Sequence, residues 1–100
     1  MFPVILPGTF SDFFAHMSKD RLLASRRLDV ALALAGQNDT EAAIDVARAA
    51  ISADPDWEEA HFVLGDIFER MGQHENAIEA FRQCLALDPV DRMGAEVRLT

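Results

Sequence analysis

From residue 20 onward, apolar side chains recur every three to four positions, which is the spacing of one face of a helix. This pattern predicts helical stretches over about 22–36, 40–53, 57–71 and 75–87. No stretch alternates apolar and polar residues in the way of a half-buried strand. The sequence therefore predicts an all-α protein.

The second pair of helical stretches repeats the first at an offset of 34 residues. Pro55 and Pro89 are separated by this distance, and each follows an aspartate that ends a helical stretch. Other positions coincide at the same offset, and the matching pairs include Glu41 and Glu75, Ala43 and Ala77, Ile44 and Ile78, Arg48 and Arg82, and Ile51 and Leu85. The pattern indicates two copies of one helix-pair unit.

A 34-residue unit of two antiparallel helices that ends in proline resembles the tetratricopeptide repeat. The unit at about 56–89 carries the family's residues in the family's order: Trp57, Leu64, Gly65, Phe68, Gly72, Ala77, Ile78, Phe81 and Leu87-Asp88-Pro89. We expect Gly65 and Ala77 where the paired helices approach most closely, and Gly72 in the tight turn between them. We expect Phe68 and Phe81 to fill the space between the helices.

The resemblance implies an antiparallel helix-pair solenoid made of two such units and flanking helices. The first unit is degenerate, because Ala31 replaces the family's first glycine, Asn38 its turn residue and Ala47 its large aromatic residue. The predicted organisation is an amino-terminal extension, two units and the truncated start of a capping or third-repeat helix, over residues 1–21, 22–55, 56–89 and 90–100.

The amino-terminal extension contains a short segment, about 11–17, with a strongly apolar helix face. This face consists of Phe10, Phe13, Phe14 and Met17. It is expected to dock either in a partner's groove or on the chain's own core, over Leu28 and Leu32. In a third interpretation, Met17 is the native start and the preceding residues are a translated leader.

The carboxyl-terminal segment is expected to form a helix over about 90–99, with Met93, Val97 and Leu99 as its apolar positions. Such a helix would cover the apolar edge of the last repeat, which a solenoid otherwise exposes.

Composition and charge narrow the class of function. Half of the residues are apolar and 26% are charged, which disfavours disorder along the whole chain. The net charge of −8 opposes binding to the phosphate backbones of nucleic acids. No apolar run has the length of a membrane-spanning helix. The single cysteine, Cys84, fits a reducing compartment, so we expect a cytoplasmic protein.

The sequence contains no recognisable catalytic or metal-binding constellation. His16, His61 and His74 do not share the i, i+3 or i+4 spacing of a zinc site. His61 is predicted to pack among apolar neighbours, His74 to be solvated, and Cys84 to be a small buried residue. The chain is therefore expected to be no enzyme and to need no cofactor or metal.

By the family resemblance, the first helix of each pair lines a concave face that binds a partner. Its expected partner-binding residues are Leu28 and Leu32 from the first unit, and Glu59, Phe62, Asp66 and Glu69 from the second. Residues 22–55 carry a net charge of −2 and residues 56–89 one of −6, so one end of the groove is acidic. The expected partner is a basic, amphipathic protein or peptide, and the open repeat edge leaves homodimerisation as an alternative.

A finer resemblance concerns residues 20–31, Pro55-Asp56-Trp57 and 87–95. These segments are similar to the start of certain bacterial proteins in which short tetratricopeptide repeats precede an S-adenosylmethionine-dependent methyltransferase domain. The resemblance implies an accessory module, with the catalytic domain downstream of residue 100.

Overall fold

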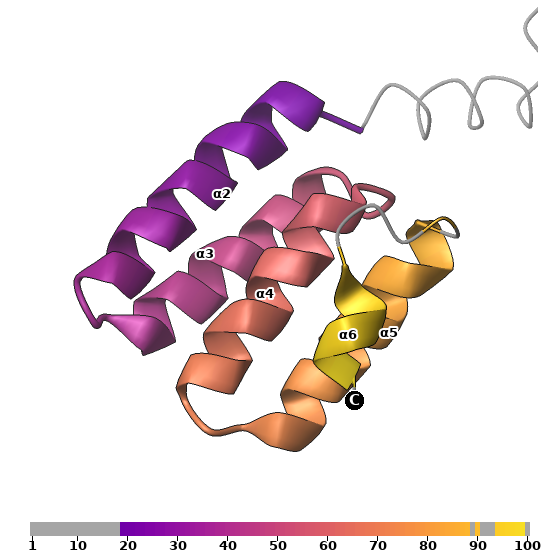
Figure 1. The fold of residues 1–100 in the computed structure, drawn as a ribbon. Helices are drawn as coiled ribbons and strands as arrows, with labels where there is room; N and C mark the ends of the chain where they lie inside the picture. Colours follow the sequence, from indigo (N-terminus) through magenta and orange to yellow (C-terminus); the bar gives the residue numbers. More distant parts are fainter. Residues whose placement is uncertain (1–18, 89, 91–93, 100) are drawn as a thin grey trace, which may run out of the picture.

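The computed structural model describes residues 19–88, 90 and 94–99. Over these residues the chain forms helices and no strand, with the helices α2 (Arg21–Gly36), α3 (Thr40–Ala53), α4 (Glu58–Arg70), α5 (His74–Leu87) and α6 (Ala95–Leu99) (Figure 1). The first four lie within one residue of the predicted stretches. The predicted apolar helix at about 11–17, with Phe10, Phe13 and Phe14, lies outside the described residues.

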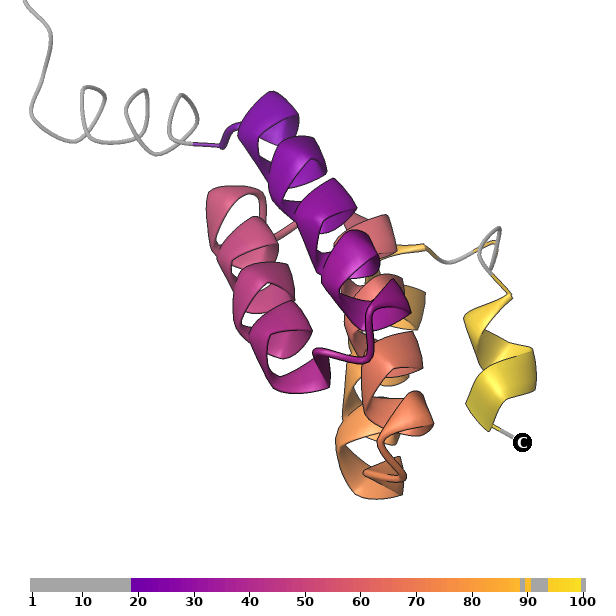
Figure 2. The ribbon, with the colours of Figure 1, turned by 90° about the vertical axis from the view of Figure 1, so that its left-hand side faces the viewer.

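The helices pack as two antiparallel pairs, α2 with α3 and α4 with α5 (Figure 1). The next helix in the chain then packs mainly on the second helix of the preceding pair, α4 on α3 and α6 on α5. Seen from the side, α3 and α6 lie on opposite sides of the molecule (Figure 2). This arrangement confirms the predicted all-α, helix-pair solenoid.

The 34-residue period is visible in the turns between the paired helices. Asn38 has a φ of 64° and Gly72 has a φ of 76°, both in the left-handed region. In each turn the backbone closes with the same hydrogen bond of 2.9 Å, from Asp39 to Leu34 and from Gln73 to Phe68. Asparagine tolerates this conformation better than most residues with a side chain. Asn38 can therefore adopt the left-handed φ that the turn requires.

The core of the first unit consists mainly of alanines. Those with no exposed surface are Ala24, Ala31, Ala43, Ala47 and Ala50. Small side chains allow two helices to pack along their length without large residues between them. The second unit buries larger residues, and Phe68 and Phe81 are 5% and 1% exposed, as predicted.

Gly65 of α4 lies directly against the Phe81 ring of α5. A Cβ atom added there would lie 2.7 Å from the Phe81 ring, well inside van der Waals contact. The buried Phe81 ring occupies the space that any side chain at this position would need.

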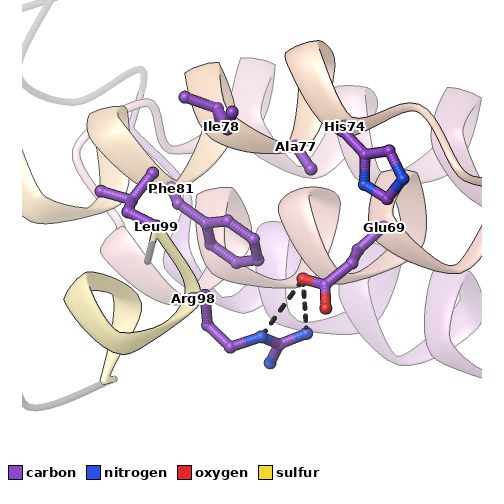
Figure 3. A pocket seen from close by; sticks show the side chains of 7 residues that line it. All are labelled: Glu69, His74, Ala77, Ile78, Phe81, Arg98 and Leu99. Atoms are coloured by element: carbon purple, nitrogen blue, oxygen red, sulfur yellow. Dashed lines mark hydrogen bonds and ion pairs between the residues drawn. The ribbon is translucent and has the colours of Figure 1, made fainter.

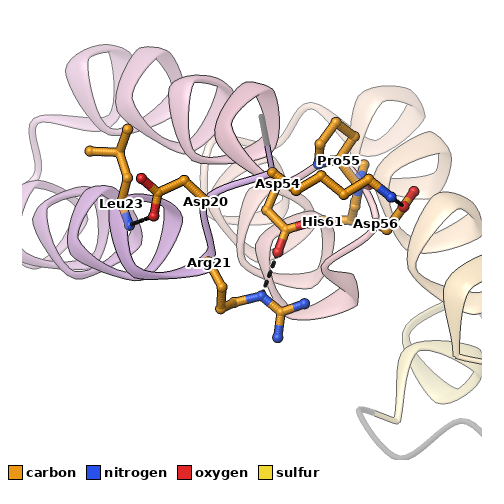
Figure 4. Close-up of polar contacts among 8 residues, drawn as sticks. Asp20, Arg21, Leu23, Asp54, Pro55, Asp56 and His61 are labelled. Atoms are coloured by element: carbon orange, nitrogen blue, oxygen red, sulfur yellow. Dashed lines mark hydrogen bonds and ion pairs between the residues drawn. The ribbon is translucent and has the colours of Figure 1, made fainter. Parts of the chain in front are cut away.

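Hydrogen bonds and ion pairs between charged side chains connect the start of α2 to the loop between α3 and α4 (Figure 4). Nε of Arg21 donates to Oδ2 of Asp54 at 2.5 Å, and the side chain of Asp54 is only 6% exposed. The Arg21 guanidinium also lies 4.8 Å from the centre of the Trp57 ring. Lys19 and Asp56 form a second, exposed ion pair across the same corner.

His61 lines a pocket with the apolar residues Ile51, Leu64 and Phe68, consistent with the predicted packing among apolar neighbours. It is partly exposed, and its Nε2 donates to the carbonyl oxygen of Pro55 at 2.9 Å (Figure 4). The ring thereby provides a hydrogen-bond donor for the carbonyl oxygen of Pro55, which lies in the α3–α4 loop and not in a helix.

Candidate functional site

The candidate partner-binding surface is the inner face formed by α2 and α4, the first helix of each pair. Leu28 was expected on this face, but it is 3% exposed and belongs to the hydrophobic core. The expectation is corrected for this residue, because the packing of the two pairs buries it. Leu32 remains 44% exposed and is available to a partner.

The α4 residues of the inner face are divided into two groups. Phe62, Asp66 and Glu69 recur along the helix at intervals of three to four residues and therefore share one face. All three contact Arg98 of α6. Glu59 is exposed and lies two turns before Asp66, outside this cluster.

Arg98 is held by two carboxylates of α4. Its Nη2 donates to Oδ1 of Asp66 at 2.6 Å and to Oε2 of Glu69 at 2.9 Å, while its Nε donates to the same Glu69 oxygen at 3.2 Å. Figure 3 shows the guanidinium beside the Glu69 carboxylate. Hydrogen bonds between charged groups are stronger than neutral ones, and the planar guanidinium suits such a fork.

Two aromatic rings complete the surroundings of the guanidinium. Its central carbon lies 5.6 Å from the Phe62 ring centre and 5.2 Å from that of Phe81. The rings are themselves 5.5 Å apart and tilted by 58°. We call the four residues Phe62, Asp66, Glu69 and Phe81 the arginine seat.

The seat stabilises the charged form of its occupant. The pKa of Arg98 is raised above its ordinary value, first by the hydrogen bond to Asp66 and then by Glu69, against a lowering by partial burial. The carboxylates of Asp66 and Glu69 therefore favour the charged guanidinium.

A cavity of about 230 Å³ adjoins the seat (Figure 3). Apolar side chains of α5 and α6 form part of its wall, with polar groups at one end. The lining residues are Glu69, His74, Ala77, Ile78, Phe81, Arg98 and Leu99. The cavity offers room for a small apolar side chain next to a bound guanidinium.

The sequence reasoning missed Arg98 and misplaced Val97. Val97 was predicted on the apolar face of the last helix but is 73% exposed, whereas Ala95 is fully buried. At the 34-residue offset, Arg98 stands where the preceding unit has the buried Leu64. A charged residue at this position, after a unit of net charge −6, was the available signal for an ion pair.

Other candidate residues have the surroundings expected of structural groups. Cys84 is fully buried and His74 is exposed, as predicted. Among residues 19–88, 90 and 94–99, no three histidine, cysteine or acidic side chains lie close enough together to hold a metal ion. Within the same residues, no helix combines the length and apolar character needed to cross a bilayer.

The stacked helix pairs, with an inner face that carries charged and aromatic groups, define a helical-repeat protein. The tetratricopeptide repeat family matches residues 21–92, and the chain belongs to this family. Repeats of this family generally mediate interactions between proteins. A comparison with curated proteins finds no match.

Proposed function

We propose that the protein is a non-catalytic protein–protein interaction module whose inner face binds a basic, amphipathic helix or peptide. The observation that supports this proposal is the arginine seat, in which Asp66 and Glu69 hold a guanidinium between aromatic rings. Carboxylates and rings so arranged select cationic, planar groups. The exposed Leu32 supplies an apolar contact at the other end of the face.

The charge distribution favours the same class of partner. The second unit carries a net charge of −6 and the first one of −2, so a basic chain is attracted to the seat end of the face. Complementary charge raises association rates and suppresses partners of the same sign. Binding is therefore expected to weaken as salt is added.

The experiment is a calorimetric titration with a synthetic amphipathic helical peptide composed of arginine, leucine and alanine. The double variant Asp66→Asn/Glu69→Gln is expected to bind about tenfold more weakly, since the two ion pairs lost at this partly exposed site together contribute about 1.5 kcal/mol.

The control variant Glu41→Gln/Asp45→Asn changes the net charge equally. Both residues are exposed and belong to α3, a helix that lies on the opposite side of the molecule from α6 (Figure 2). It is expected to keep the affinity of the natural chain. Equal affinities for the two double variants would overturn the proposal.

The resemblance to the repeat region of methyltransferase proteins supports a second proposal, that of an accessory module. The family match concerns the repeat, over residues 21–92, so this finer assignment stays a prediction. The reading frame after the codon for Thr100 tests it. A strand followed by a glycine-rich turn within the following domain supports the assignment, and a stop codon there removes it.

Self-association is a third proposal, supported by α2, the first helix of the solenoid. Leu22, Val30 and Leu32 are 61%, 50% and 44% exposed on this helix, which leaves apolar surface at the edge of the solenoid. Two copies that covered this edge mutually would form a symmetric dimer. Light scattering that shows a monomer at all concentrations would remove this proposal.

A further inference from the structure

The arginine seat belongs to α4 and α5, while its occupant belongs to α6. Phe62, Asp66 and Glu69 are on α4, and Phe81 is on α5. These two helices form one antiparallel pair, fixed by the contact between Gly65 and Phe81. The seat is therefore built without α6, and Arg98 enters it as a ligand would.

The helix that carries Arg98 is short. α6 spans five residues, Ala95–Leu99, and so short a helix has little stability of its own. Ala95 is buried and Leu99 packs against the core, but Val97 is 73% exposed. Arg98 adds ion pairs with Asp66 and Glu69 to these apolar contacts of α6.

The surface beside the seat has a counterpart in the first unit that is covered by a helix. Ala77, Ile78 and Phe81 of the cavity correspond to Ala43, Ile44 and Ala47, which are 0 to 8% exposed. Ile44 of the first unit lines a pocket together with Phe68 of α4 and Met71, the residue that follows α4. The equivalent surface of the second unit is therefore shaped to take apolar side chains of a helix.

We propose that the arginine seat and the adjoining cavity form a recognition site for an amphipathic helix in which an arginine precedes apolar residues by about one turn, and that Arg98 occupies this site in cis as a displaceable competitor. The inference rests on the proposed function and names the partner's chemistry. The guanidinium of Arg98 must leave before another can enter. The apparent affinity for the partner is therefore the intrinsic affinity multiplied by the fraction of molecules in which the seat is empty.

The first test is a titration of the full chain with a synthetic amphipathic helical peptide that has one arginine, with leucines three and four residues later. Arg98→Ala is expected to bind this peptide about five- to tenfold more tightly, because the competitor is gone. Arg82→Ala is the matched control, since Arg82 is exposed on α5 and its loss changes the net charge equally. It is expected to leave the affinity unchanged. Circular dichroism checks that both variants keep their helices.

The outcomes separate this inference from the proposed function. If Arg98→Ala binds no better than Arg82→Ala, while Asp66→Asn/Glu69→Gln still weakens binding, the competition is overturned and the interaction module stands. If the peptide fails to bind even Arg98→Ala, both are overturned.

Two further readouts address the chemistry and the displacement. Replacing the peptide's arginine with lysine is expected to weaken binding about fivefold, since lysine lacks the planar fork that two carboxylates and two rings accommodate. Equal binding of the lysine peptide contradicts a guanidinium site. Amide hydrogen exchange at residues 95–99 is expected to accelerate when the arginine peptide binds, and slower exchange there contradicts displacement of α6.

Discussion

Gly65 shows how a single missing side chain determines the packing of a helix pair. In an exposed helix, a change from glycine to alanine stabilises by about 1 kcal/mol, because glycine has the greater backbone freedom to lose. At Gly65 this gain is opposed by the Phe81 ring, 2.7 Å from the position of the added Cβ. The ring is 1% exposed and surrounded by the core, so it has little room to move.

We expect Gly65→Ala to lower the free energy of unfolding by about 1–3 kcal/mol, the usual cost of overfilling a core. Gly36→Ala is the control, since Gly36 lies in α2 with no atom within 4 Å of an added Cβ. It is expected to be neutral or stabilising. Urea unfolding measures both, and equal effects would contradict the tight approach at Gly65.

Substitutions at the two turn residues, Asn38 and Gly72, test their left-handed conformation. Gly72→Ala is expected to destabilise by about 1–2 kcal/mol, since a left-handed φ of 76° is costly for alanine. Asn38→Gly, at a φ of 64°, is expected to be neutral or slightly stabilising. Thermal unfolding distinguishes them, and a neutral Gly72→Ala would show that the turn relaxes into another conformation.

At the scale of elements, the corner between α2 and the α3–α4 loop depends on one nearly buried carboxylate. Asp54 has a side chain that is 6% exposed and receives a hydrogen bond from Arg21. The backbone N–H of Asp20 also donates to the carbonyl oxygen of Ala53 at 2.9 Å, so charge and backbone bind the same two segments.

We expect Arg21→Ala to destabilise the fold by about 1–3 kcal/mol, because it leaves the Asp54 carboxylate buried without this donor. Arg26→Ala, exposed on the same helix, is the control and is expected to change stability by less than about 0.5 kcal/mol. Equal effects in chemical denaturation would show that solvent already satisfies Asp54.

The exposed pair at the same corner predicts a dependence on pH. The hydrogen bond and charge of Lys19 lower the pKa of Asp56 below 3.8, and Asp56 raises the pKa of Lys19 above 10.5. The aspartate's contribution is present above 3.8 and is lost as pH falls through its lower folded pKa. The lysine's contribution is complete below 10.5 and is lost as pH rises through its higher folded pKa.

We therefore expect the stability difference between the natural chain and Lys19→Gln to be small and constant between these limits, and to vanish in acid. Unfolding curves recorded over a range of pH measure it. Added salt should reduce the difference, because both groups are exposed. A difference that grows in acid would contradict the assignment.

At the scale of the whole molecule, the core is one continuous cluster through both units. It extends from Leu28 through Ile44 and Phe68 to Ala95, so the short α6 shares the core of the repeats. Cys84 lies within this cluster with no exposed surface. A reagent reaches its thiol only when the cluster opens.

We expect the Cys84 thiol to react with a disulfide reagent more slowly in the native protein than in denaturant, by a factor on the order of 10³ or more. This factor is the ratio of folded to unfolded molecules. Reaction at the rate of the denatured chain would contradict one cooperative core. Labelling of Arg98→Ala tests whether the loss of its ion pairs loosens the second unit.

The helices, their order and the 34-residue period followed from the sequence alone. Apolar spacing and local turn residues such as Asn38 and Gly72 act within a few positions of the chain. The acidic character of Asp66 and Glu69 also followed from the sequence, because it depends on composition alone. Only the tertiary structure decided that Leu28 is buried, that His61 bonds to Pro55, and that Arg98 occupies the acidic end of the inner face. Each of these depends on contacts between helices and loops that are distant in the sequence. The periodicity of apolar residues along the chain carries no information about such contacts.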